Sequence, residues 1–260
     1  MHIKTYIYLT IFSLFLHGCS LLPNPDDDTD HWGARKIYTE AKSLLDNYDY
    51  ENAIKFYELL ESRYPFGRYA KQGQIEIAYA YYKFEEPESA IAAADRFIKL
   101  HPNHPHVDYA HYLKGLIYFT HETGILGSIF KQDASSRDPA SSRQAFDEFT
   151  ALVRKFPNSR YAKDARLRAL YLRNSLASHE LHVAKYYLSR RAYVAAVNRC
   201  KYVLENYDRS MSVPEALDVM AQAYDGLGLT VLAADARRVK EKTFAGNVPK
   251  KHEKSWWNIF

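Results

Sequence analysis

The chain has 260 residues, of which 47% are hydrophobic, and a formal net charge of +4 at neutral pH. This composition is ordinary for a globular protein, and the length suffices for one large domain or an array of repeats. Only two cysteines are present, which excludes a disulfide-rich scaffold. The 10 glycines and 10 prolines are few beside 22 tyrosines, which favours helices joined by short loops.

The first 18 residues have the order of charge and apolar residues found in secretory signal peptides. Lys4 precedes the apolar run from Thr5 to Leu16, which is too short to span a bilayer, since spanning takes about 20 residues. The run continues into His17-Gly18-Cys19, which resembles the lipobox of bacterial lipoproteins, although a small residue is usual in place of His17. The resemblance implies that Cys19 carries an N-acyl chain, such as palmitate, and an S-diacylglycerol.

Lipidation of Cys19 would tether the chain to a membrane, because two or more acyl chains on one residue form a stable anchor. Ser20 follows it instead of aspartate, and the same resemblance then implies the outer membrane. Cys200 would be the only thiol left, so we expect no intrachain disulfide. Residues 19–33 are interpreted as the acylated cysteine and a flexible, acidic and proline-rich spacer.

A repeated helical pattern begins at residue 34. In three segments an alanine (Ala53, Ala90 and Ala145) precedes a proline by twelve positions, with apolar residues four and seven positions after the alanine. This spacing predicts one face of a helix that the proline ends. The small residues Ala41 and Ala78, twelve positions before the first two alanines, would let a partner helix approach closely. Such a 34-residue helix-turn-helix is typical of the tetratricopeptide repeat.

The third repeat departs from this spacing, because its small residue is Gly115 and about 18 extra residues stand between its two helices. The stretch from Tyr161 to Leu188 lacks glycine and proline, which predicts one long helix joining the third and fourth repeats. We therefore predict an all-α tetratricopeptide-repeat superhelical solenoid of about five repeats, with four as an alternative count. The predicted repeats lie near residues 34–67, 71–104, 108–157, 159–210 and 214–247, followed by a basic aromatic tail, 248–260.

Stacked repeats bind extended peptides and other proteins on a concave surface. The catalytic and nucleotide motifs GxSxG, GxxxxGK[ST] and CxxC are absent from the sequence. The segment HELHV at His179 lacks the second histidine of a zinc protease, because Val183 occupies its place. Four histidines between His101 and His111 are another metal candidate, but an inter-repeat loop explains them more simply. We expect no enzyme activity, no metal and no cofactor apart from the covalent lipid.

Basic residues concentrate near the end of the chain, with seven Lys or Arg and three Asp or Glu between Asp235 and Lys254. An exported lipoprotein does not meet nucleic acid, so no nucleic-acid partner is expected. A solvated helix face, or contact with an acidic partner or a lipid surface, remain as interpretations. The final segment KSWWNIF slightly favours contact, because tryptophan and phenylalanine beside lysine suit a membrane interface, although it could equally dock into a groove.

Four longer segments, together with the lipobox and the repeats, resemble the BamD family, the lipoprotein subunits of the outer-membrane β-barrel assembly (BAM) complex of Gram-negative bacteria. The resemblance covers nearly all of residues 19–245. It is carried by the segments RYPFGRYAKQGQIEIAYAYYKF, DRFIKLHPNHPHVDYAHYLKGL, DPASSRQAFDEFTALVRKFPNSRYA and VAKYYLSRRAYVAAVNR.

This resemblance implies a non-enzymatic scaffold, lipid-anchored at the periplasmic face of the outer membrane, that assists insertion of β-barrel proteins. The first repeats would bind the carboxy-terminal, aromatic-rich strand of unfolded barrel proteins. The last repeats would dock on the POTRA domains of BamA, with other BAM lipoproteins alongside.

An unfolded barrel strand alternates apolar and polar side chains and ends in an aromatic residue, so its receptor should offer aromatic pockets. Tyr64 is the first choice, because it lies in RYPFG, which the resemblance places at the client-binding end. Arg199 matches an arginine that the family directs toward BamA and could clamp a carboxylate, or it could lie on a solvated helix face. Any of the tyrosines could instead pack between repeats. The client-binding candidates are Tyr38, Tyr64, Phe66, Tyr69, Tyr79 and Tyr82.

Two other classes of function stay open at this point. Another envelope adaptor, such as a Tol-system coordinator or a peptidoglycan-associated scaffold, would share the repeats and the tether but have different partners. A cell-wall lytic enzyme with a helical solenoid would need a separate catalytic domain, and the repeats between residues 34 and 247 leave no room for one.

Overall fold

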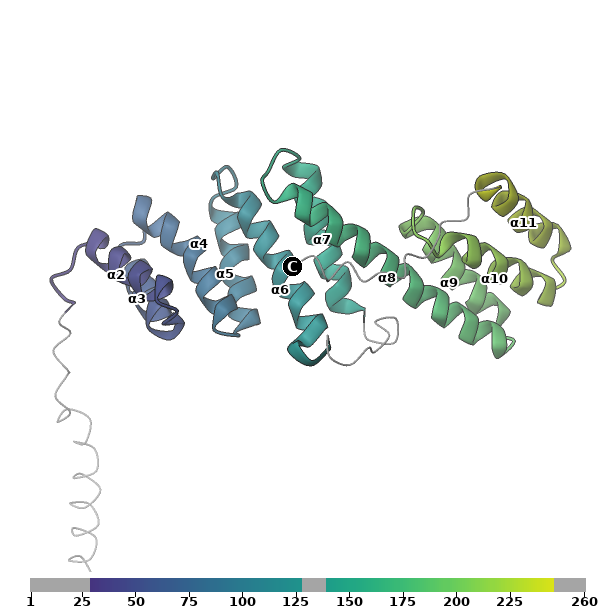
Figure 1. Cartoon of the computed structure of the whole chain (residues 1–260), viewed down its shortest axis with the longest axis horizontal. Coiled ribbons are helices and arrows are strands. Elements are labelled where there is room, and N and C mark those ends of the chain that lie inside the picture. Colours follow the sequence, from purple (N-terminus) through teal and green to yellow (C-terminus); the bar gives the residue numbers. More distant parts are fainter. Residues whose placement is uncertain (1–28, 128–138, 246–260) are drawn as a thin grey trace, which may run out of the picture.

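The computed structural model describes residues 29–127 and 139–245, in which ten helices stack in chain order into an elongated solenoid (Figure 1). These residues contain no β-strand, so the prediction of an all-α repeat solenoid is confirmed. Consecutive helices form five hairpin-like pairs. The pairs are α2 (Ala34–Asp46) with α3 (Tyr50–Arg63), α4 (Arg68–Lys83) with α5 (Pro87–Leu100), α6 (Val107–Gly127) with α7 (Ala140–Lys155), α8 (Ala162–Ser189) with α9 (Tyr193–Asn206), and α10 (Val213–Gly226) with α11 (Thr230–Phe244).

Several predicted features lie outside the described residues: the signal peptide 1–18, the lipidation site Cys19, most of the spacer and the tail 248–260. Lipidation therefore stays a prediction. In the described segments, no helix combines the length and the apolar character needed to cross a membrane.

The turns inside four of the five pairs share one backbone conformation. Tyr48, Glu85, Arg191 and Gly228 each have a φ between 59° and 74°, in the left-handed region. The next residue in each turn donates its N–H to a carbonyl five positions earlier, which closes the first helix as in a Schellman motif. The N–H groups of Asp49, Glu86, Ala192 and Leu229 bond the carbonyls of Leu44, Tyr81, Tyr187 and Tyr224 at 2.9 to 3.0 Å.

The predicted spacing of alanine and proline corresponds to the ends and the buried faces of the second helices. Helices α3, α5 and α7 each end two residues before the predicted proline. Their alanines are fully buried, as are Phe97 and Phe149 seven and four positions farther on. Because each buried face packs on the neighbouring helix of the same repeat and of the next, the core is a series of inter-repeat clusters.

The third repeat differs in part from its prediction. Helix α6 continues to Gly127, so the first residues of the predicted insertion extend this helix and do not form a connecting segment. Residues 128–138 of the insertion lie outside the described residues. The long helix predicted from Tyr161 to Leu188 is confirmed by α8, which has 28 residues from Ala162 to Ser189.

Cys200 is a free cysteine buried in the cluster around the fourth and fifth repeats. Burial raises the pKa of its thiol to about 12. Because the thiolate is the reactive form, this residue is a structural, unreactive cysteine.

Candidate binding groove

A groove of about 430 Å³ runs across the first helices of the first three repeats, α2, α4 and α6, to the beginning of α8. Its lining combines aromatic rings with charged and amide side chains. The tyrosines are Tyr48, Tyr50, Tyr79, Tyr109 and Tyr161, and the ionisable and amide residues are Lys42, Asp46, Gln72, Glu76, His106 and Arg160.

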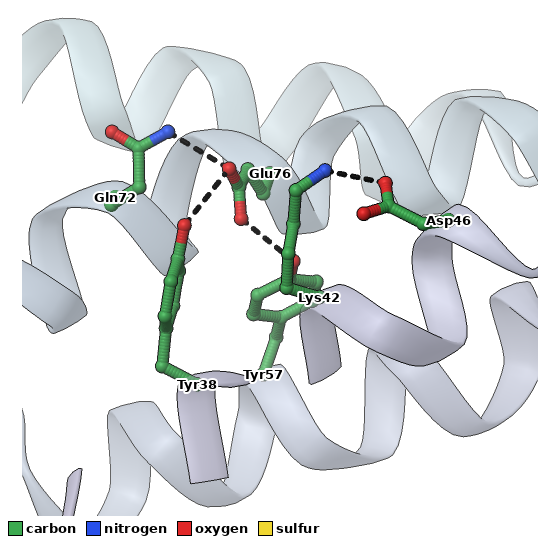
Figure 2. A network of polar contacts seen from close by, with 6 residues as sticks. All are labelled: Tyr38, Lys42, Asp46, Tyr57, Gln72 and Glu76. Atoms are coloured by element: carbon green, nitrogen blue, oxygen red, sulfur yellow. Dashed lines mark hydrogen bonds and ion pairs between the residues drawn. The ribbon is translucent and has the colours of Figure 1, made fainter. Parts of the chain in front are cut away.

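Glu76 is the centre of a hydrogen-bond network in the first two repeats (Figure 2). Its Oε1 accepts from Tyr38 Oη at 3.2 Å and from Gln72 Nε2 at 2.9 Å, and its Oε2 accepts from Tyr57 Oη at 2.7 Å. The donors come from α2, α3 and α4. The network therefore joins the first repeat to the second at the floor of the groove.

The same hydrogen bonds stabilise the carboxylate of Glu76. Burial, and then the adjacent Glu76 carboxylate, raise the pKa values of Tyr57 and Tyr38 well above their usual range. Both hydroxyls therefore remain donors to the carboxylate at any physiological pH. Beside them, Lys42 Nζ lies 2.6 Å from Asp46 Oδ1, so this end of the groove carries compensated charges (Figure 2).

The other end of the groove is a cluster of aromatic rings between α6 and α8. The Tyr161 ring stacks on Tyr112 with centroids 4.8 Å apart and lies 5.4 Å from Tyr109. Tyr112 Oη donates to Asp164 Oδ2 at 2.7 Å, which holds its ring in place. The Arg160 guanidinium lies 4.7 Å from the centroid of Tyr161.

The six aromatic residues predicted to bind clients do not lie at one site in the structure. Tyr79 lines the groove, and Tyr38 contacts its floor through Glu76 and packs on Tyr69 with ring centroids 5.3 Å apart. Tyr64 and Phe66 lie between α3 and α4, outside the groove lining.

Tyr64 donates its hydroxyl to the Trp32 carbonyl at 3.0 Å, whereas the Phe66 side chain is 90% exposed. Tyr82 packs against the buried cluster between the second and third repeats, so its contacts are those of a core residue.

Several groove residues were missed in the sequence: Glu76, Tyr109, Arg160 and Tyr161. Glu76 carried a signal, because it interrupts the apolar segment QIEIAYAYY with a charge on a helix that packs on both sides. The sequence around Arg160 and Tyr161 gave no such signal, since these residues lie beside the second repeat only through the superhelical arrangement.

Arg199 lies at a second hollow, about 350 Å³ in volume, whose lining includes Tyr187, Asn198 and Tyr202. Its Nη1 is 2.9 Å from Glu180 Oε2, and Glu180 is only 3% exposed. Arg143 Nη2 approaches the other carboxylate oxygen of Glu180 at 3.5 Å. Arg199 is therefore a half-exposed guanidinium held by a buried carboxylate, and not a freely solvated side chain.

Of the four histidines considered as metal ligands, His101, His104 and His106 have neighbouring rings, and His111 is engaged elsewhere. His101 Nε2 lies 2.7 Å from Gln74 Oε1 in the pair α4 and α5. His111 Nδ1 lies 2.9 Å from Glu148 Oε2 in the next pair, α6 and α7. Across residues 29–127 and 139–245, no three potential ligands are close enough to hold a metal ion.

The family model and the curated relatives point to the same family of outer-membrane proteins. A family model described as "YfiO: Outer membrane lipoprotein" matches residues 31–239. A protein of Neisseria meningitidis serogroup A named "Outer membrane protein assembly factor BamD" is 42% identical over 98% of each chain. A Vibrio cholerae protein of the same name is 36% identical over 88% of this chain and 94% of its own. The solved structure of MamA from Desulfovibrio magneticus covers 82% of this chain and 96% of its own at 12% identity and a TM-score of 0.37.

Proposed function

The chain belongs to the YfiO family of outer-membrane lipoproteins, which includes the assembly factor BamD, and on this premise we propose that it acts as a scaffold subunit of the BAM complex. In this role it is lipid-anchored through Cys19 at the periplasmic face of the outer membrane. It binds the carboxy-terminal strands of unfolded β-barrel proteins and docks on the POTRA domains of BamA, beside other BAM lipoproteins. It catalyses no reaction.

The groove across the first three repeats carries this proposal. Extended barrel strands alternate apolar and polar residues. The groove offers both tyrosine rings for the apolar side chains and hydroxyl, amide and charged groups for the polar ones. Tyrosine gives a large contact area at low entropic cost, which suits a receptor for many client sequences. Tethering raises the effective concentration of a bound client near BamA, which assists assembly without an energy source.

Replacing Tyr48 with asparagine tests the groove. Tyr48 lines it with 77% of its side chain exposed, and asparagine tolerates the left-handed backbone at this position. We expect about fivefold weaker binding of a fluorescent peptide from the final strand of a barrel protein, as for an interface residue worth about 1 kcal/mol. The measurement is fluorescence anisotropy.

The matched control for this variant is Tyr186→Asn, since Tyr186 is 55% exposed near the end of α8 and outside the groove. The control should bind the peptide as the wild type does. A second variant, Tyr79→Ala, removes another ring from the groove lining. Wild-type affinity in both Tyr48→Asn and Tyr79→Ala would show that the peptide binds elsewhere.

Docking on BamA is proposed at Arg199 and its hollow. Arg199→Glu is unsuitable as a test, because it would set a second carboxylate against the buried Glu180, so loss of folding would accompany loss of binding. Arg199→Gln keeps a donor for Glu180 and removes the charge.

We expect Arg199→Gln to capture at least about tenfold less of the isolated POTRA domains, because a charged hot-spot contact is worth more than 1.4 kcal/mol. Lys201→Gln, on the same helix with an exposed side chain, should capture as much as the wild type does. Equal capture by all three proteins would remove Arg199 from the interface.

A further inference from the structure

The charged residues that line the groove have ion-pair or hydrogen-bond partners at one end, whereas the arginine at the other end has no carboxylate partner among the described residues. Lys42 is paired with Asp46, and Glu76 accepts three hydrogen bonds. Arg160, at the α8 end, is exposed and forms no ion pair with a carboxylate of the described residues; its Nη2 donates to the Tyr161 hydroxyl. The groove therefore has a direction, from compensated charge at α2 to a free guanidinium at α8.

The acidic residue that most influences Arg160 is already engaged. Asp108 raises the pKa of Arg160 only after the larger contribution of Tyr161. Its Oδ2 accepts from Ser159 Oγ at 2.6 Å, and its Oδ1 accepts from the Tyr109 N–H at 2.7 Å. Apart from the hydrogen bond to Tyr161, the guanidinium consequently keeps its donors available for an anion that enters the groove.

An aromatic platform lies directly beside this guanidinium. Tyr109 and Tyr161 both line the groove, and their rings are 5.4 Å apart. Tyr161 is held from behind by its stack on Tyr112 and by its own N–H, which donates to Ser159 Oγ at 3.1 Å. A guanidinium without a carboxylate partner in the described part of the chain, next to fixed aromatic rings, is complementary to a residue that carries both an aromatic side chain and a carboxylate.

The last residue of a peptide that ends in phenylalanine or tyrosine is such a group. We propose that Arg160 binds the terminal carboxylate of the extended client, while the Tyr109 and Tyr161 rings receive its final aromatic side chain. The client then lies with its carboxyl terminus at α8 and its upstream residues toward Tyr79 and Tyr48. This inference rests on the proposed client-binding function and adds to it the polarity of the bound strand and the residue that reads its end.

A terminal carboxylate fits these residues better than an acidic side chain within the client. Arginine binds a carboxylate through two parallel hydrogen bonds, and at a chain end that carboxylate belongs to the same residue as the final ring. An internal aspartate or glutamate would bring the same charge without fixing an aromatic group at this distance. The two sources differ in one respect that can be tested, since amidation of the peptide removes only the terminal charge.

The test uses the full chain in mild detergent and one fluorescent ten-residue peptide of alternating apolar and polar residues that ends in phenylalanine. The peptide is prepared with a free carboxyl terminus and with a carboxyl-terminal amide. We expect the wild type to bind the free acid about tenfold more tightly than the amide, the size of one charge-assisted contact. Arg160→Gln should bind both forms with the wild-type affinity for the amide. Arg154→Gln, an exposed arginine of α7 outside the groove lining, should keep the tenfold preference.

The outcomes separate this inference from the proposed function. Tight and equal binding of acid and amide by the wild type would overturn the role of Arg160 and leave client binding intact. A preference for the acid that persists in Arg160→Gln would move the carboxylate to another residue. Binding of neither form would contradict both the inference and the client-binding function.

Discussion

Replacing Phe149 with alanine is expected to lower the free energy of unfolding by about 3–5 kcal/mol, the usual cost of deleting a buried aromatic ring. Phe149 is 0% exposed. Its ring packs with Phe119 of α6 and with Leu172 of α8, so it holds the third repeat to the fourth. Chemical unfolding followed by circular dichroism measures the change, and Phe66→Ala is the matched control, because Phe66 is 90% exposed.

Gly115 packs against the Phe149 ring and allows a second test of the same contact. A Cβ at this position would lie 2.5 Å from the Phe149 ring, closer than real contacts allow. We therefore expect Gly115→Ala alone to cost about 1–3 kcal/mol by overpacking. In the Phe149→Ala background most of that cost should disappear, because the added methyl group occupies space that the ring has left. Additive effects in this double-mutant cycle would contradict the packing described here.

Replacing Lys114 with methionine is the second change expected to have a large effect. Lys114 is 8% exposed and lies 2.6 Å from Asp95 of α5 and 2.5 Å from Glu148 of α7, so one ammonium joins two repeats. Removing the ammonium leaves the largely buried Glu148 with His111 as its remaining partner, and breaking a buried ion pair costs up to about 3–5 kcal/mol. The loss of unfolding free energy should be far larger than for Lys99→Met, an exposed lysine on α5.

The pH dependence of this difference provides an independent check. Burial alone would lower the pKa of Lys114, but hydrogen bonds to Asp95 and Glu148 outweigh it and raise that pKa. Burial alone would raise the pKa of Glu148, but hydrogen bonds from His111 and Lys114 outweigh it and lower that pKa.

The stabilisation by Glu148 is therefore present above its ordinary pKa of 4.5 and is lost as the pH falls through the lower pKa of the folded state. The stabilisation by Lys114 is present below 10.5 and is lost as the pH rises through its raised pKa. The wild type should exceed Lys114→Met by a constant margin between these limits and by less below pH 4.5. A margin that does not change in acid would mean that the ion pairs contribute nothing.

The helices and their buried faces could be predicted because they depend on local periodicity. The spacing from Ala145 to Phe149 and Pro157 follows from 3.6 residues per turn and from the exclusion of proline from a helix interior. Gly115 was recognisable as a close-approach position for the same reason. The extension of α6 was missed because the repeat spacing placed the whole insertion between the two helices, although no proline before Pro139 ends the helix.

The groove could be predicted only in part, because its residues meet through the stacking of repeats. Tyr79 lines the groove and Tyr38 lies beside it, but the acceptor of the Tyr38 hydroxyl, Glu76, draws its donors from three helices. Tyr82 belongs to an inter-repeat contact that sequence periodicity does not distinguish from a binding surface. Arg160 reaches the groove from the beginning of the fourth pair, a relation set by the superhelical path and not by sequence spacing.

A role in the BAM complex can be tested by quantitative mass spectrometry of the proteins that co-purify with the tagged, full-length chain from outer membranes in mild detergent. We expect a POTRA-bearing β-barrel protein in near-equal amount, accompanied by smaller lipoproteins. Recovery of Tol proteins or peptidoglycan fragments in its place would contradict a role in the BAM complex.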